Sequence, residues 1–116
     1  MKPGAFLPLS KATLYILLAL AAEDRHGYAI MQEVIRQSGG QYKLGPGTLY
    51  DNLQKLVNQG LITETSARSI SDDPRRRYYR LTGLGRRVLV AEVARMEAVV
   101  QEARRHLPAT SFGRAV

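Results

Sequence analysis

The stretch LGPGTLYDNLQKLVNQG, residues 44–60, decides the fold, because it marks both ends of a helix and separates its two faces. Pro46 suits the first helical position, where its fixed φ fits and its missing N–H would have no partner within the helix. Gly60 supplies the left-handed conformation that commonly ends a helix. Pro46 and Gly60 therefore predict the start and the end of one helix, and the outer face of this helix is a candidate binding surface.

The two faces of this helix separate on a wheel of 100° per residue. Its apolar residues form one stripe centred about 30° from Leu49. The opposite face has hydrogen-bonding groups of the kind that contact base edges and phosphates, with Lys55 as its cation. The stripe comprises Leu49, Leu53, Leu56 and Val57, the polar face Thr48, Asp51, Gln54, Lys55 and Asn58, and the boundary Tyr50 and Asn52.

Length and composition favour one small domain with an anionic partner. The chain has 116 residues, 45% of them apolar, and a net charge of +7 with a pI near 10.1. Such a charge favours nucleic acid or an anionic membrane surface as the partner. Because the chain has no cysteine, it has no thiolate ligand or disulfide, which suits a cytoplasmic protein.

Two further helices are predicted ahead of residue 44. Ser10 is a good N-cap for the first, and Gly39 and Gly40 end the second. A break at residues 24–27 separates them. The predicted apolar stripes are Leu14, Leu17, Leu18 and Ala21 on the first helix, and Tyr28, Met31, Val34 and Ile35 on the second.

A two-stranded hairpin and a long helix are predicted after residue 60. Residues 61–65 and 77–82 resemble short strands, joined by the turn-rich, basic ARSISDDPRR. Thr82 can cap a helix that runs to about Leu107. Three helices followed by a hairpin indicate a winged helix-turn-helix, a mainly α fold with a small β-hairpin. The predicted parts are a flexible arm (1–9), a DNA-binding domain (10–82), a C-terminal dimerisation helix (83–107) and a polar tail (108–116).

Positive charge concentrates around the hairpin. Residues 61–87 contain seven arginines and three acidic residues, a local charge of +4. Arg75, Arg76 and Arg77 follow the turn residues Ser-Asp-Asp-Pro and so are expected at or beside the tip of the wing. There they would reach a phosphate or a minor groove.

The last helix has a seam of apolar residues with spacings of 4, 3, 4, 3 and 4, the pattern of a coiled-coil interface. The helix would be about 37 Å long at 1.5 Å per residue, too long to bury this seam on so small a body. A homodimer is therefore predicted. The seam consists of Leu89, Val93, Met96, Val100, Ala103 and Leu107.

The segments GYAIMQEV, LGPGTLYDNLQKLVNQGLI and DDPRRRYYRLTGLGRRVL, in this order, closely resemble the PadR-like transcriptional regulators. The resemblance implies a winged-helix repressor that dimerises through its C-terminal helix on a palindromic operator. It also implies DNA contacts by Thr48, Tyr50, Lys55 and the wing arginines. The full set expected to contact DNA is Lys43, Gly47, Thr48, Tyr50, Asp51, Asn52, Gln54, Lys55, Arg75, Arg76 and Arg77.

Two departures from the family pattern stand within the recognition helix. Gly45 replaces a frequent Ser, and Asp51 replaces a frequent Pro. A Gly N-cap costs only about a few tenths of a kcal/mol, so Asp51 is the change expected to alter base preference. The single C-terminal helix is similar to that of the smaller PadR-like subfamily, some of whose members hold flat aromatic ligands between subunits. A small-molecule effector of this chain is left unidentified.

Other functions find weaker support in the sequence. Gly83-Leu84-Gly85 imitates a dinucleotide fingerprint, but Val88 occupies the position of the third glycine. The two histidines are isolated, so neither a metal site, a cofactor nor a catalytic centre is expected. Lys2 and the apolar run 14–22 imitate a signal peptide, but the run is needed as a core helix and is too short to span a membrane. A basic dimeric adaptor for protein or RNA is the main alternative.

Overall fold

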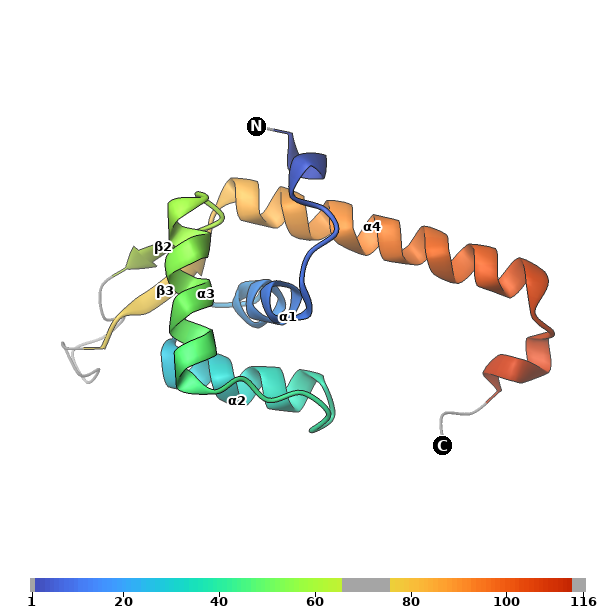
Figure 1. Cartoon of the computed structure of the whole chain (residues 1–116), viewed down its shortest axis with the longest axis horizontal. Coiled ribbons are helices and arrows are strands. Elements are labelled where there is room, and N and C mark those ends of the chain that lie inside the picture. The colour runs from blue at the N-terminus through green and yellow to red at the C-terminus, as the bar shows by residue number, and fades with distance from the viewer. Residues whose placement is uncertain (1, 66–75, 114–116) are drawn as a thin grey trace.

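The computed structural model describes residues 2–65 and 76–113. Three helices form the body, α1 (Lys11–Leu20), α2 (Gly27–Gln37) and α3 (Pro46–Asn58). The long helix α4 (Gly83–His106) starts beside the sheet and projects away from the body (Figure 1). The predicted winged helix-turn-helix with a long C-terminal helix is confirmed. In the described ranges, none of the helices combines the length and apolarity needed to cross a membrane.

Helices α1, α3 and α4 begin where the sequence predicts, at Ser10, Pro46 and Thr82. Ser10 Oγ accepts a hydrogen bond from Thr13 N at 3.2 Å, and Thr82 Oγ1 accepts one from Gly85 N at 3.0 Å. Pro46 occupies the first turn of α3, and Gly60 adopts a left-handed φ of 76° just after that helix. The two side-chain hydrogen bonds satisfy backbone N–H groups that have no acceptor within the helix, and Pro46 has no N–H to satisfy.

The wing is part of a three-stranded antiparallel sheet with the order β1-β3-β2. Strands β2 (Ile62–Thr65) and β3 (Tyr78–Leu81) pair as predicted, with Ile62 opposite Leu81 and Thr65 opposite Tyr78. Strand β1 (Arg25–His26) pairs with Tyr79 and Tyr78. The sequence pattern predicted only a break there, because two residues have no detectable alternation and become a strand only through β3.

Buried residues of α1, α2, α3 and α4 and of strands β2 and β3 form one core. The predicted stripe of α1 is only partly correct: Leu17 is buried, but Leu14 and Leu18 are half-buried. The reason is that α1 is apolar almost all round, so a wheel cannot select the side that packs. The buried α1 residues are Thr13, Ile16, Leu17, Ala19 and Leu20.

The stripe predicted for α2 is also partly wrong. Val34 is buried, but Tyr28 is 60% exposed and Ile35 36% exposed. The helix packs instead through Gly27, Ile30 and Val34, an i, i+3, i+7 face. Tyr28 is displaced from that face by one position and lies at the surface.

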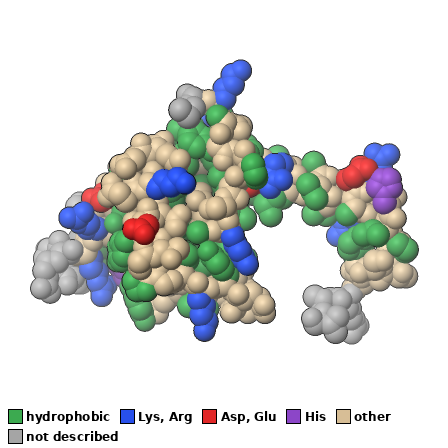
Figure 2. Space-filling view, viewed as in Figure 1, with side chains coloured by type: hydrophobic (Ala, Val, Ile, Leu, Met, Phe, Trp, Pro, Cys, Tyr) green, Lys and Arg blue, Asp and Glu red, His purple; other side chains and the backbone are tan. Residues whose placement is uncertain are grey.

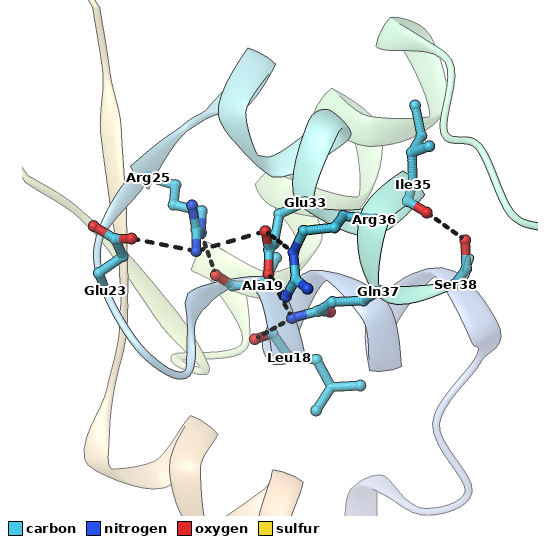
Figure 3. A network of polar contacts seen from close by, with 9 residues as sticks. All are labelled: Leu18, Ala19, Glu23, Arg25, Glu33, Ile35, Arg36, Gln37 and Ser38. Atoms are coloured by element: carbon cyan, nitrogen blue, oxygen red, sulfur yellow. Dashed lines mark hydrogen bonds and ion pairs between the residues drawn. The ribbon is translucent and has the colours of Figure 1, made fainter. Parts of the chain in front are cut away.

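A polar network joins the end of α1 to α2 (Figure 3). Arg25 Nε donates to the Ala19 carbonyl at 2.7 Å, and its guanidinium pairs with Glu33 at 3.8 Å. Glu33 also accepts two hydrogen bonds from Arg36 and one from Gln37. The Arg36 hydrogen bond is the main cause that holds the Glu33 pKa below its ordinary value, against an opposing effect of burial.

Gly85 lets α4 begin directly over the chain that enters β2. A Cβ at Gly85 would lie 2.0 Å from the Leu61 carbonyl oxygen, far inside van der Waals contact. That oxygen also accepts a hydrogen bond from Thr82 N at 3.1 Å. The second glycine of the Gly-Leu-Gly motif is therefore explained by close packing of a helix on the backbone.

A short 3-10 helix lies within each of the segments predicted as a flexible arm (1–9) and a polar tail (108–116). The N-terminal segment contains a 3-10 helix, η1 (Pro3–Phe6), which packs on α4. The C-terminal segment contains a second one, η2 (Ala109–Phe112). The ring of Phe112 lies 4.7 Å from the Arg104 guanidinium, a cation–π contact that holds this segment to the end of α4.

Candidate nucleic-acid interface

Helix α3 divides into the two faces that its sequence predicts. Leu49, Leu53 and Leu56 are buried, and Val57 is half-buried. The surface over α3 is mainly polar and neutral, and basic side chains gather beside it near the wing (Figure 2). The exposed residues of the predicted DNA-binding set in and before this helix are Lys43, Gly47, Thr48, Tyr50, Asp51, Gln54 and Lys55.

Several polar side chains on α3 contact their own helix. Asn52 is half-buried, and its Nδ2 donates to the Thr48 carbonyl at 2.8 Å. Gln54 Nε2 donates to Asn58 Oδ1 at 3.1 Å. In the described part of the chain, Asp51 has no hydrogen-bond or ion-pair partner, and its carboxylate is exposed. Asp51 and Lys55 are thus exposed charged side chains that lie one helical turn apart.

Tyr50 links α3 to the start of α2. Its side chain is 50% exposed, and its hydroxyl lies so close to Gly27 that a Cβ there would approach it to 2.4 Å. Beside it lies a pocket of about 370 Å³ between α3, the start of α2 and the outer end of the wing, where Thr65 pairs with Tyr78. The lining residues are His26, Gly27, Tyr28, Tyr50, Arg76, Arg77 and Tyr79.

Two guanidinium groups, those of Arg76 and Arg77, line the pocket. His26 Nδ1 accepts from Ala29 N at 3.2 Å, so the neutral ring has its proton on Nε2. That nitrogen lies 3.2 Å from Arg76 Nη1, so the imidazole and the guanidinium line the same end of the pocket. Burial raises the pKa of Tyr79, which keeps its hydroxyl protonated. The arrangement favours a negatively charged group at this end of the pocket.

The arginines counted around the hairpin have different roles. Arg77 pairs with Glu64 at 3.4 Å, and Arg76 and Arg77 directly precede β3 at the outer end of the wing, where Thr65 pairs with Tyr78, as the prediction beside the tip requires. Arg80 makes a bidentate pair with Asp24, its Nη2 2.9 Å from Oδ2, and Arg86 donates to the Ala21 carbonyl at 3.2 Å. The predicted contact Arg75 lies outside the described residues. Arg80 and Arg86 therefore hold the fold together, and Arg76 and Arg77 remain next to α3.

The projecting part of α4 exposes most of the predicted seam. Val93, Met96, Val100 and Leu107 are 39%, 41%, 46% and 48% exposed, and Ala103 is half-buried. Leu89, which was predicted for the same interface, lies in the core instead, at 7% exposure. The reason is that the first turns of α4 pack on the body and use Leu89 there.

An apolar groove of about 540 Å³ runs between α4 and α1. Leu14 and Leu18 form its α1 side, which explains why they are not in the core. Hydrophobic side chains line the exposed length of α4 (Figure 2). The α4 side of the groove comprises Val93, Met96, Glu97, Val100, Gln101 and Arg104.

Sequence reasoning missed His26, Gly27 and Glu92. Glu92 is 1% exposed in the middle of α4, and the spacing of four residues from Val88 to Glu92 was an available signal that both share the packed face. Gly27 had no signal, because its role depends on contact with Tyr50. No group of three or more His, Asp or Glu that could hold a metal occurs among residues 2–65 and 76–113.

Comparison with known proteins gives a consistent result. The sequence profile of the transcriptional regulator PadR-like family matches residues 16–91. The transcriptional regulator Rv3488 of Mycobacterium tuberculosis is 35% identical over 89 residues, which cover 77% of this chain and 78% of Rv3488.

Solved structures share the fold. A PadR family transcription regulator from Clostridium difficile R20291 superposes with a TM-score of 0.72 at 24% identity, covering 85% of this chain and 100% of that one. The Bacillus subtilis PadR, solved in complex with operator DNA, superposes with a TM-score of 0.63 at 23% identity, covering 74% and 48%.

Proposed function

Because this chain belongs to the PadR-like family of transcriptional regulators, we propose that it binds a palindromic operator as a homodimer and represses transcription there. The observation that carries the proposal is the exposed polar face of α3 beside a pocket that Arg76 and Arg77 line at the outer end of the wing. A regulator of this kind works on DNA in the cytoplasm. We also propose the domain boundaries that the sequence predicts: residues 10–82 bind DNA, and residues 83–107 form the dimer interface.

In this proposal α3 enters the major groove. Thr48, Gln54 and Lys55 face the base edges and the nearest phosphates from the exposed side of the helix. Asp51 accepts a hydrogen bond from a cytosine N4, the base group that suits a carboxylate. Arg76 and Arg77 contact phosphates beside the groove, and Tyr50 fills the space between them and α3.

The exposed apolar seam supports the dimer. Paired through Val93, Met96 and Val100, two copies would present two α3 helices to major grooves about 34 Å apart. An operator with two-fold symmetry follows from such a dimer. A small-molecule effector would act by changing the separation of the two helices, since both can contact bases only at one spacing.

Binding to the DNA upstream of the chain's own gene tests the proposal. A footprint there should reveal an inverted repeat, and fluorescence anisotropy on that duplex should give its affinity. If about six phosphates are neutralised, affinity should fall roughly a thousandfold between 50 and 200 mM salt. Equal affinity for unrelated duplexes, or preference for single-stranded RNA, would support the adaptor alternative instead.

A pair of variants localises the interface. Replacing both Arg76 and Arg77 by Ala removes four charges from the dimer, so it should reduce the slope of log affinity against log salt by about 4. Arg105→Ala removes the same kind of charge at the far end of α4, and its slope should equal that of the wild type. Equal slopes for all three proteins would remove the wing from the interface.

A further inference from the structure

Glu92 is a buried acid where an apolar residue would pack more cheaply. It is 1% exposed, and burying a carboxylate is costly unless hydrogen bonds compensate. Its Oε2 accepts from Leu9 N at 2.8 Å, and its Oε1 accepts from Arg95 Nε. Both carboxylate oxygens are therefore used, one within α4 and one by a residue 83 positions earlier in the sequence.

The partner of Glu92 belongs to a segment that crosses α4, the strap, defined as residues 3–9. Phe6, Leu7 and Leu9 of the strap are half-buried against the core, and η1 packs on α4. The strap leads directly into Ser10, which caps α1. Glu92 thus ties the entry of α1 to the middle of α4.

The strap also reaches the end of α3. A small groove of about 210 Å³ has Phe6, Pro8 and Leu9 on one side and Lys55 and Gln59 on the other. The strap passes in front of α4 on its way to α1 (Figure 1). The strap therefore packs on α4 and faces the end of the helix proposed to enter DNA across this groove.

Glu92 lies where α4 leaves the body. The buried residues of α4 are Gly85, Val88, Leu89 and Glu92, so Glu92 is the last of them. Residues 93–106, the projecting part of α4, extend for about 21 Å at 1.5 Å per residue. A rotation of about 10° at its base would displace the far end by roughly 4 Å, more than one base-pair rise of about 3.4 Å.

We propose that Glu92 is a positioning residue, which fixes the angle between α4 and the DNA-binding body through the strap and so sets the separation of the two α3 helices. This inference rests on the proposed homodimer. Packing by the strap's apolar side chains alone would leave a hinge at residue 92, because apolar contacts are not directional. The hydrogen bond from Leu9 N to Glu92 Oε2 is directional, and it therefore fixes the angle between α4 and the body.

Distance measurement between the two subunits tests this role. The chain has no cysteine, so Asn58→Cys on exposed α3 accepts a single spin label per subunit. Double electron–electron resonance on the dimer then reports the separation of the α3 helices without DNA. The parent protein should give one narrow distance distribution.

Substitutions at both ends of the bond should change that distribution. Glu92→Met keeps an unbranched side chain but removes the acceptor, and should at least double the width. Leu9→Pro removes the donor and leaves α4 unchanged, so it should broaden the distribution even if Glu92→Met does not fold. Glu92→Gln retains an acceptor oxygen and should stay narrow. Glu102→Gln makes the same change at an exposed site of α4 and is the matched control.

The same variants should lose spacing preference on DNA. With the inverted repeat lengthened or shortened by one base pair, the parent should lose at least tenfold in affinity, and Glu92→Met less than threefold. Narrow distributions in both Glu92→Met and Leu9→Pro would overturn the inference and leave DNA binding intact. A parent protein without any dipolar signal would overturn both the inference and the homodimer.

Discussion

Gly85→Ala should destabilise the protein far more than a glycine substitution in a helix normally does. The added Cβ would lie 2.0 Å from the Leu61 carbonyl oxygen, whereas real Cβ atoms keep at least 3.0 Å from such atoms. The helix and the Leu61 backbone must therefore separate by 1.0 Å, the difference of these two distances. Neither can yield easily, because Leu61 is 1% exposed and its N–H donates to the Leu56 carbonyl.

The cost follows from what this separation breaks. Thr82 N donates to the Leu61 carbonyl at 3.1 Å, and another 1 Å would remove that hydrogen bond, worth about 1 kcal/mol. Overpacking adds about 1–3 kcal/mol, and Ala in a helix recovers about 1 kcal/mol. The free energy of unfolding should fall by about 1–3 kcal/mol, which lowers the melting temperature by roughly 5–15 °C.

Gly83→Ala is the matched control, two residues earlier in the same helix. The nearest atom to its added Cβ is Arg87 Nη1 at 3.5 Å, an ordinary contact. This variant should be as stable as the wild type or up to about 1 kcal/mol more stable. Urea unfolding followed by circular dichroism, at one protein concentration because of dimerisation, gives both values. Stabilities of Gly85→Ala and Gly83→Ala within about 0.5 kcal/mol of each other would refute the reasoning.

Three further outcomes are expected. Gly27→Ala should weaken operator binding at least fivefold with little loss of stability, because its Cβ displaces only the end of the Tyr50 side chain. Fluorescence anisotropy measures the affinity and a thermal melt the stability, and an unchanged affinity would contradict this prediction. Val100→Asp should raise the dimer dissociation constant at least a hundredfold in sedimentation equilibrium, and an intact dimer would disprove the seam. The pKa of Glu33 is lowered from 4.5, so the stability that Glu33 contributes is present above that value and is lost as the pH falls through its folded-state pKa. The stability of Glu33→Gln should therefore fall less in acid than that of the wild type. Urea midpoints of the two proteins that change equally from pH 7 to pH 3 would contradict this.

Local signals made most of the fold predictable. Ser10, Pro46 and Thr82 act within one helical turn of their own position, so the sequence alone predicts the helix starts. The same holds for α3, whose polar and apolar residues alternate with helical period and leave a single side to bury. The hairpin strands were predictable because β-branched and aromatic residues flank a turn-rich segment.

The remaining features depend on contacts between distant residues. Arg25 and His26 become a strand only when β3 lies beside them, and Glu92 is acceptable in the core only because Leu9 and Arg95 donate to it. The charge count around the hairpin overstated the DNA-binding surface, since pairing of Arg80 with Asp24 is invisible in composition. Helix α1 illustrates the limit of periodicity, because an almost entirely apolar helix shows no preferred side.

The two-residue strand β1 has a consequence for engineering new specificity. Since residues 25–26 supply the outer strand of the sheet, and Arg80 on β3 is clamped by Asp24 beside it, the wing shares its edge with the segment between α1 and α2. A chimera that transplants residues 62–81 from a relative must therefore bring the donor's counterpart of residues 24–26 as well. On the exposed side of α3, Asp51 and Lys55, which are proposed to contact DNA, have no such partner among the described residues and are exchangeable one at a time, whereas Tyr50 contacts Gly27. Wing and recognition helix are in this sense separately evolvable, the first as a linked block and the second residue by residue.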